Sequence, residues 1–321
     1  MTNEISVFAP AKINLFLEVT SKRADGYHNI ATLFAKIAAG DNIKISARKA
    51  DKTAIELKIK GPLAGGLKGD KTNLAYKAAA AFLEHFGINA ECAIRLEKNI
   101  PMAAGLGGGS SDAAAVIAGL RALFNIEINA KRMKDLIKLA AGLGADVPFF
   151  LREEKYCKGE GIGEVLTPVK NNIVSPWIVL VCPKEPSPTK EAYAGLQLNK
   201  KEQILTNVSN LNKIIDSIKV GNPLEDWRSL TYNKLEDCVF KRIASVSALK
   251  KELLALGADA AMMSGSGSCV FTLVKDKLKA KEIARQAGRA DGGRFICLTH
   301  FWRTRHENHG NTDSSYGGRA A

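Results

Sequence analysis

The sequence has no long hydrophobic run, and this lack argues against a membrane-spanning helix. Its most apolar later stretch covers only residues 177–181, whereas a spanning helix needs about 20 apolar residues. Lys12, Asn14 and Glu18 interrupt the apolar residues near the N-terminus, so no signal peptide is expected there. We therefore expect a cytoplasmic protein with no membrane partner.

The sequence also lacks a cysteine framework. Its six cysteines stand singly, without a C-x-x-C pair, and its five histidines do not form a metal-ligand cluster with them. Neither a disulfide scaffold nor a structural zinc site is expected. We expect reduced thiols, several of them buried as small apolar side chains. The six cysteines are Cys92, Cys157, Cys182, Cys238, Cys269 and Cys297.

Positive charge is abundant but dispersed. The formal net charge is +13, yet no dense basic block occurs along the 321 residues. A nucleic-acid surface would interleave its basic residues with aromatic ones, and no such patch is found. The 46% hydrophobic and 25% charged residues are typical of a soluble globular protein with its own core. The charge therefore predicts only a general attraction for anions.

Hydrophobic patterning predicts an α+β protein in which strands and helices alternate. A turn-rich segment at 151–175 suggests a boundary between an N-terminal domain, 1–160, and a C-terminal domain, 161–302. Residues 303–321 are polar and aperiodic, so we expect a flexible tail there. The predicted strands cover 13–19, 42–47, 55–59, 92–96, 177–181, 269–274 and 294–298, and the predicted helices cover 74–86, 131–141 and 279–288.

A glycine-rich segment leads into another predicted helix. Residues 101–112 are PMAAGLGGGSSD. Glycines let backbone N–H groups converge on an anion, and a helix N-terminus favours negative charge. It is not a Walker A loop, because no Lys-Ser/Thr follows the last glycine. We predict a phosphate-binding loop with Ser110 or Ser111 as N-cap, and a plain turn is the alternative. Asp112 is expected to be a first-turn acid and not catalytic.

Asp146 and Lys12 are charged residues in apolar surroundings. Lys12 interrupts an apolar predicted strand, where a charge is costly unless it is paired. A Lys12–Asp146 pair facing bound phosphates would keep the carboxylate ionised and stabilise charge on a transferred group. The alternatives are that Asp146 is a helix cap or turn residue and that Lys12 is a strand-edge lysine with its head in water.

Two further segments have the composition of binding loops. Arg23-Ala24-Asp25-Gly26-Tyr27-His28 contains an Asp-Gly turn signal, which would project Tyr27 and His28 where they can stack on a base. The Gly/Ser segment at 264–268 precedes a predicted buried strand and could lie against phosphates. Plain turn residues and a tight connection are the alternatives.

Taken together, these segments resemble the superfamily of galactose, homoserine, mevalonate and phosphomevalonate kinases. The matching segments are Pro-Ala-Lys-Ile-Asn-Leu at 10–15, the glycine run at 101–111 and Ser-Gly-Ser-Gly at 264–267. Arg-Ala-Asp-Gly-Tyr-His at 23–28 and Gly-Ala-Asp-Val-Pro at 144–148 resemble the branch that phosphorylates a cytidine-diphosphate-linked sugar alcohol, methylerythritol. The resemblance covers about residues 8–300.

The resemblance implies a two-domain α+β small-molecule kinase with its active site in the cleft between domains. The N-terminal domain would resemble domain 2 of ribosomal protein S5, and the C-terminal domain would be a ferredoxin-like α/β sandwich. ATP and Mg²⁺ would be required, the metal ligands being unknown. Apart from the small-molecule substrate we expect no nucleic-acid partner, and a monomer or weak homodimer. The alternatives are a homoserine- or mevalonate-type kinase, or a basic non-catalytic RNA-binding protein.

The resemblance also implies roles for individual residues. Asp146 would take a proton from the substrate's 2-hydroxyl, and Lys12 would orient it. Tyr27 and Tyr193 would sandwich the cytosine, His28 would read its polar edge, and Asn14 would contact the substrate. The residues around ATP would be Pro101, Met102, Ala103, Ala104, Gly105, Leu106, Gly107, Gly108, Gly109, Ser110, Ser111, Asn73, Leu74 and Lys98.

Overall fold

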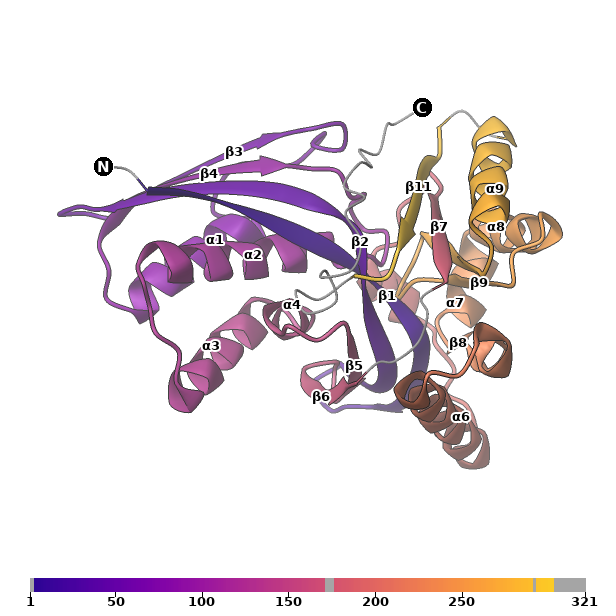
Figure 1. Ribbon diagram of the computed structural model, residues 1–321. Coiled ribbons are helices and arrows are strands. Elements are labelled where there is room, and N and C mark those ends of the chain that lie inside the picture. The colour runs from indigo at the N-terminus through magenta and orange to yellow at the C-terminus, as the bar shows by residue number, and fades with distance from the viewer. Residues whose placement is uncertain (1–2, 171–175, 291–292, 303–321) are drawn as a thin grey trace. The chain divides into compact units, whose positions relative to one another are not determined.

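The computed structural model of the chain describes residues 3–170, 176–290 and 293–302 (Figure 1). The chain divides into two compact units, which are described separately here. The first unit comprises residues 1–11, 40–101 and 107–153, and the second comprises residues 12–39, 102–106 and 154–321. The predicted tail at 303–321 lies outside the described residues, and the domain boundary after residue 160 stays a prediction.

Two long strands, β1 (Asn3–Lys22) and β2 (His28–Lys49), run through both units. In the first unit, β2 pairs antiparallel with β4 (Ala90–Glu97), which pairs parallel with β3 (Ala54–Lys60). Burial alternates along β4, because successive side chains of a strand point to opposite faces. The buried side chains of β4 therefore lie on one face of this sheet, and helices can cover that face.

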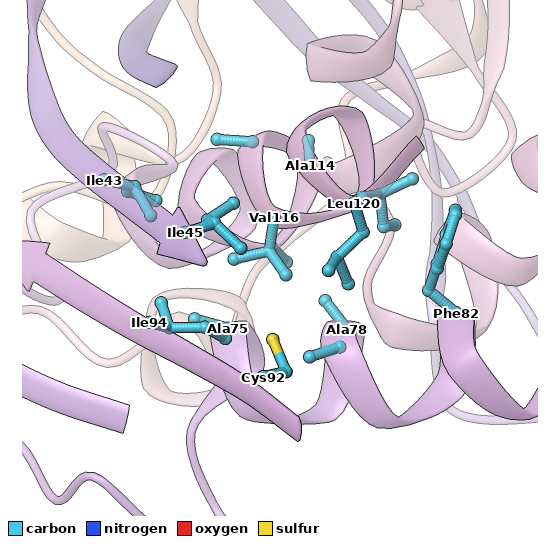
Figure 2. Close-up of a cluster of buried hydrophobic side chains, with 14 of the residues drawn as sticks. Ile43, Ile45, Ala75, Ala78, Phe82, Cys92, Ile94, Ala114, Val116 and Leu120 are labelled. Carbon is cyan, nitrogen blue, oxygen red and sulfur yellow. The ribbon is translucent and has the colours of Figure 1, made fainter. Parts of the chain in front are cut away.

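Alanine-rich helices cover that face and form the core of the first unit (Figure 2). Figure 2 shows Ala75 and Ala78 of one helix and Ala114 of its neighbour among larger side chains from β2 and β4. Small residues let two helix backbones approach closely while the aliphatic side chains fill the remaining space. The helices of this unit are α1 (Leu74–His85), α2 (Gly108–Leu123), α3 (Ala130–Leu143) and α4 (Val147–Leu151).

The second unit contains a four-stranded antiparallel sheet in the order β11-β7-β10-β9. Every residue of its inner strand β10 is buried, although one face of an antiparallel sheet is often exposed to water. Helices α8 and α9 contribute Val246, Leu249, Leu253 and Ile283 to its core. The strands are β7 (Trp177–Cys182), β9 (Ala260–Met263), β10 (Val270–Val274) and β11 (Phe295–His300), and the helices are α8 (Ala244–Ala255) and α9 (Lys277–Ala290).

Shorter elements complete the second unit. A hairpin of β5 (Tyr156–Glu160) and β6 (Val165–Val169) extends from β2, and the two-residue strand β8 (Tyr232–Asn233) pairs parallel with β1. The 151–175 segment, predicted only as turn-rich, therefore contains a hairpin. The remaining helices are α5 (Thr189–Tyr193), α6 (Lys201–Val220) and α7 (Glu236–Arg242), with 3-10 turns at Leu224–Asp226 and Arg228–Leu230.

Most predicted elements are confirmed, but the start of α2 is not. The N-cap is Gly107, in the left-handed conformation at φ 69°, and the helix begins at Gly108. The prediction that Ser110 or Ser111 caps this helix is wrong, because the glycines themselves enter the helical turn. Asp112 consequently lies beyond the first turn, and its predicted role as a first-turn acid is wrong as well.

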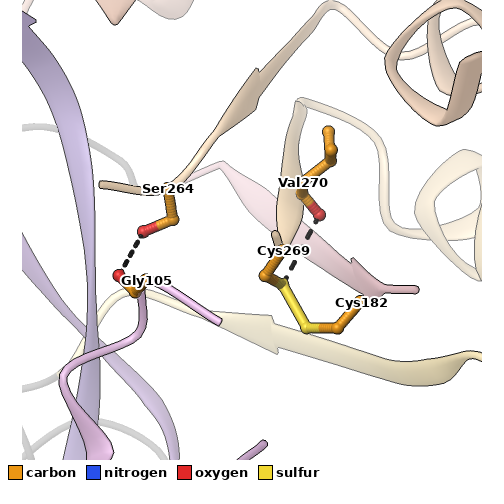
Figure 3. The surroundings of a disulfide bond; sticks show 5 residues. All are labelled: Gly105, Cys182, Ser264, Cys269 and Val270. Carbon is orange, nitrogen blue, oxygen red and sulfur yellow. Dashed lines mark hydrogen bonds between the residues drawn. A yellow bond between two sulfur atoms is a disulfide. The ribbon is translucent and has the colours of Figure 1, made fainter. Parts of the chain in front are cut away.

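The expectation that all cysteines are reduced is also wrong for one pair. Cys182 and Cys269 form a disulfide across 87 positions of sequence (Figure 3). Val181 of β7 pairs with Val270 of β10, so the next pair along this antiparallel ladder is Cys182 with Cys269. Their Cα atoms are 4.1 Å apart, and this proximity cannot be predicted from their distant positions in the sequence. Among the described residues, no helix is long and apolar enough to cross a membrane.

Candidate active site

The first part of the glycine-rich segment is held by hydrogen bonds to its backbone carbonyls within the second unit. The N–H of Lys12 donates to the carbonyl of Leu106 at 3.0 Å, and the hydroxyl of Ser264 donates to the carbonyl of Gly105 at 2.9 Å (Figure 3). The predicted Gly/Ser loop thus connects β9 to β10 and also contacts the glycine-rich segment. The alternative that this loop is only a tight connection therefore does not account for its contact with the glycine-rich segment.

Gly105 has no room for a side chain. Its φ is +75°, and a Cβ there would lie 1.8 Å from the carbonyl oxygen of Ser264. The backbones of the two loops therefore approach each other more closely than any other residue type permits.

The second part of the segment forms the start of α2 in the first unit. Gly107 and Gly108 carry the turn into the helix, where the first N–H groups have no intrahelical partner. Such groups, together with the helix dipole, favour an anion. Leu74 lies beside this turn, because a Cβ on Gly109 would be 3.5 Å from its Cδ1. Asn73 caps α1 by accepting a hydrogen bond from Ala75 N at 2.9 Å.

A buried ion cluster lies under this helix start. The ammonium of Lys98, only 2% exposed, donates to Asp41 at 2.5 Å and to Asp112 at 2.8 Å. The second oxygen of Asp41 accepts from the N–H groups of Asn99 and Ile100 at 2.5 and 2.9 Å. Lys98 was predicted to border ATP, and the structure places its charged group inside this cluster.

Burial disfavours the charge of Lys98, but the two neighbouring carboxylates outweigh it and raise the Lys98 pKa. Burial also raises the pKa of Asp112, to about 7, against the opposing effect of Lys98 and with further help from Asp41. One ammonium cannot fully compensate two carboxylates. Asp112 therefore holds a proton more readily than an ordinary aspartate does.

Lys12 begins a second polar row, on β1 and β2 of the second unit. Its ammonium donates to Asn14 Oδ1 at 2.7 Å, and Asn14 Nδ2 donates to Thr32 Oγ1 at 2.8 Å. Lys12 is 4% exposed, so the alternative of a strand-edge lysine with its head in water is wrong. A Cβ on Gly265 would lie 3.0 Å from the Lys12 ammonium, which places the Gly/Ser loop beside this charge.

Asp146 occupies the N-cap position of the short helix α4, in the first unit. Its side chain makes no capping hydrogen bond within the described residues, and Pro148 follows in the first turn. The structure thus does not support the alternative that Asp146 acts as a helix cap. The predicted pairing of Asp146 with Lys12 stays a prediction.

The structure brings together two of the three predicted cytosine-binding residues. The rings of His28 and Tyr193 stack with centroids 5.1 Å apart and an interplanar angle of 26°. Tyr27 lies on the predicted turn between β1 and β2 and is 61% exposed. Burial lowers the pKa of His28, and nearby Lys22 lowers it further, so both effects favour the neutral ring.

Sequence analysis missed several residues that hold these loops. Asn233 donates to the carbonyls of Met263 and Gly265, both at 2.8 Å, and Thr32 donates to the carbonyl of Phe16 at 2.6 Å. Asp41 follows Gly40 in the sequence and resembles an ordinary turn residue. A polar residue inside an apolar stretch is the only signal that could have indicated Thr32.

Comparisons with known proteins agree with this architecture. Residues 73–154 match the N-terminal domain of the GHMP kinases, and residues 213–292 match the C-terminal domain. A solved homoserine kinase from Cytophaga hutchinsonii superposes with a TM-score of 0.75 at 20% identity, over 95% of this chain and 96% of that one. The two family matches define a kinase of the GHMP class.

The chain belongs to the GHMP kinase family, and it is a phosphotransferase that uses ATP. A relative from Clostridium botulinum named 4-diphosphocytidyl-2-C-methyl-D-erythritol kinase is 40% identical, covering 85% of this chain and 92% of its own. One from Macrococcus caseolyticus with that name is 35% identical, over 86% and 92%. A solved 4-(cytidine 5'-diphospho)-2C-methyl-D-erythritol kinase superposes with a TM-score of 0.70 at 32% identity, over 93% and 100%. The predicted α+β two-domain kinase fold is confirmed.

We predict that Gly105→Ala strongly reduces kinase turnover. The new Cβ would meet the Ser264 carbonyl, and the left-handed backbone alone costs about 1–3 kcal/mol, so the two loops must separate. Turnover and thermal unfolding measure the effect. Gly65→Ala, at a position with open space around the new Cβ, is the matched control. Unchanged turnover in Gly105→Ala would contradict the close approach of the loops.

We also predict a pH signature for Asp112. Because its pKa is raised on folding, the folded state gains stability from protonated Asp112 that is complete below about pH 4 and lost as pH rises to about 7. The free energy of unfolding of the wild type, relative to Asp112→Asn, should fall by about 1 kcal/mol per pH unit within that window. Urea unfolding at pH 5, 6, 7 and 8 measures it. A constant difference would show that Asp112 does not titrate there.

Proposed function

We propose that this chain transfers the γ-phosphoryl group of ATP to the 2-hydroxyl of 4-diphosphocytidyl-2-C-methyl-D-erythritol, in the non-mevalonate isoprenoid precursor pathway. Relatives with the corresponding name share 35–40% identity over most of both chains. The observation that carries the proposal is the stacked pair of His28 and Tyr193. Homoserine and mevalonate carry no nucleobase, so a kinase that phosphorylates them does not need such a pair for its alcohol substrate.

In the proposed reaction, Asp146 accepts the proton of the substrate hydroxyl. The hydroxyl oxygen forms a bond to the γ-phosphorus as the bond from that phosphorus to the β–γ bridging oxygen breaks, and ADP leaves with the electron pair. Lys12 would stabilise the negative charge of the transferred group. Its buried ammonium, fixed by Asn14 at 2.7 Å, is already oriented, so little reorganisation would be needed. Asn14 would in turn contact the substrate.

ATP would be bound by the glycine-rich segment 101–111, whose N–H groups and helix start suit phosphate oxygens. Asn73 and Leu74 would border the nucleotide, since Leu74 lies beside Gly109. Mg²⁺ would bridge phosphate oxygens, as it commonly does, with few protein ligands. Among the described residues, no group of three His, Cys, Asp or Glu side chains could hold a metal ion.

Cytosine recognition would use Tyr27, His28 and Tyr193. A base can stack on each tyrosine ring, and the neutral imidazole of His28 has both a donor and an acceptor for the polar edge of cytosine. The exposure of Tyr27 is consistent with a ring that becomes covered only when the base binds. We further propose a cytoplasmic monomer or weak homodimer with no nucleic-acid partner.

An ADP-release assay with several alcohols tests the proposal. The cytidylated methylerythritol should be turned over in preference to homoserine and mevalonate. Turnover of homoserine or mevalonate alone would overturn the substrate assignment. Tight, steeply salt-dependent RNA binding without any ATP turnover would overturn the assignment as an enzyme.

We predict that Asp146→Asn abolishes most turnover and leaves ATP affinity nearly intact. The amide cannot accept the proton, a role that contributes typically 10²–10⁴-fold to the rate. Single-turnover rates and nucleotide affinity measure the two effects separately. A near-normal rate would remove Asp146 as the base.

We predict that Tyr27→Ala weakens the cytidylated substrate by about 1–3 kcal/mol, the usual contribution of a base–aromatic stack. ATP affinity should change little, because the tyrosine would contact only the cytosine. Comparing KM for the two substrates tests this. An equal loss for both would mean that Tyr27 supports the fold rather than the base.

A further inference from the structure

The Asp41–Lys98–Asp112 cluster connects the two ends of the glycine-rich segment. At the entry, Asp41 accepts hydrogen bonds from the N–H groups of Asn99 and Ile100, immediately before Pro101. At the exit, Asp112 belongs to α2. Lys98 bonds to both carboxylates. Two buried acids and one lysine therefore fix the points where the loop begins and ends.

Lys98 also lies directly beneath the first helical residue. A Cβ on Gly108 would be 3.0 Å from its ammonium nitrogen. Two of its three N–H donors are used by carboxylates, and its side chain is 3% exposed. Any movement of Asp112 or Lys98 would therefore shift the helix start, whose N–H groups would bind the phosphates in the proposed function.

The net charge of the cluster would also affect the helix start. With both acids ionised, the cluster would carry one net negative charge close to an anion-binding helix start, which would oppose phosphate binding. Protonation of Asp112 makes the cluster neutral. Asp112 Oδ1 is buried and has no hydrogen-bond partner among the described residues, and a protonated oxygen tolerates that environment better than a charged one.

We propose that Asp41, Lys98 and Asp112 are positioning residues for the ATP-phosphate loop, and that Lys98 acts on the loop rather than on the nucleotide. This inference rests on the proposed function of that loop. It replaces the expectation that Lys98 borders ATP, because the lysine ammonium contacts two carboxylates instead. A lysine that binds phosphate directly would instead need its ammonium free of carboxylates.

Calorimetric titration with Mg²⁺ and AMP-PNP, a non-hydrolysable ATP analogue, tests the inference through a double-mutant cycle. Lys98→Met and Asp112→Ala should each raise the Kd by about tenfold, and the double variant should also raise it by about tenfold rather than hundredfold, because residues acting through one contact are not additive. Adenosine, which has no phosphates, should bind all variants within about twofold of the wild type. Lys58→Met, on the exposed surface of β3, is the control.

Asp112→Asn adds a rescue test. Asparagine keeps an acceptor for Lys98 and places an amide where the protonated carboxyl would be, so it should bind AMP-PNP at least about fivefold more tightly than Asp112→Ala. Asp112→Ala leaves the Lys98–Asp41 pair intact, and it keeps the test decisive if Lys98→Met does not fold.

Two outcomes would overturn the inference. In the first, Lys98→Met weakens AMP-PNP binding while Asp112→Ala does not, as expected for a direct contact. In the second, the single effects multiply in the double variant. Failure of the wild type to bind AMP-PNP would instead overturn the proposed function itself, so the two failures are distinguishable.

Discussion

The buried ion cluster of Asp41, Lys98 and Asp112 is the constraint on which the phosphate loop depends. Charges this deeply buried are tolerated only with partners and hydrogen bonds, so β2, β4 and α2 must meet in one arrangement. The alanine-rich faces of α1 and α2 allow that arrangement, because they let α2 approach the sheet closely. In the first unit, this one arrangement therefore determines both the packing of the core and the geometry of the loop.

The second unit also contains a buried lysine that is held by side-chain hydrogen bonds. Lys12 is buried on β1, and Asn14 and Thr32 continue its hydrogen bonds to the backbone at Phe16. Loops that could otherwise move are fixed by backbone contacts, of which the approach of Gly105 to Ser264 is the closest. In each unit, taken by itself, buried side chains and backbone contacts hold the loops on a rigid support, and fixed polar groups are what electrostatic catalysis requires.

Local patterns predicted the features that depend on neighbours in sequence. The helix at 74–85 follows from its apolar periodicity, the turn at 23–28 follows from Asp-Gly, and the burial of Lys12 follows from the apolar strand around it. Features that depend on distant partners were missed. Cys182 and Cys269 are 87 positions apart, and Asp41 has no local feature that points to Lys98. The helix cap at Gly107 was misjudged because serine is the commoner cap, whereas here glycine supplies the left-handed backbone.

The central claim is that the N–H groups of Gly107, Gly108 and Gly109 bind the phosphates of ATP. Backbone amide NMR spectra of the protein, recorded with and without Mg²⁺ and AMP-PNP, test it most directly. The account predicts large shifts of these three amide signals with AMP-PNP and small ones with adenosine. Unchanged signals at these three glycines, in a protein that binds AMP-PNP, would contradict it.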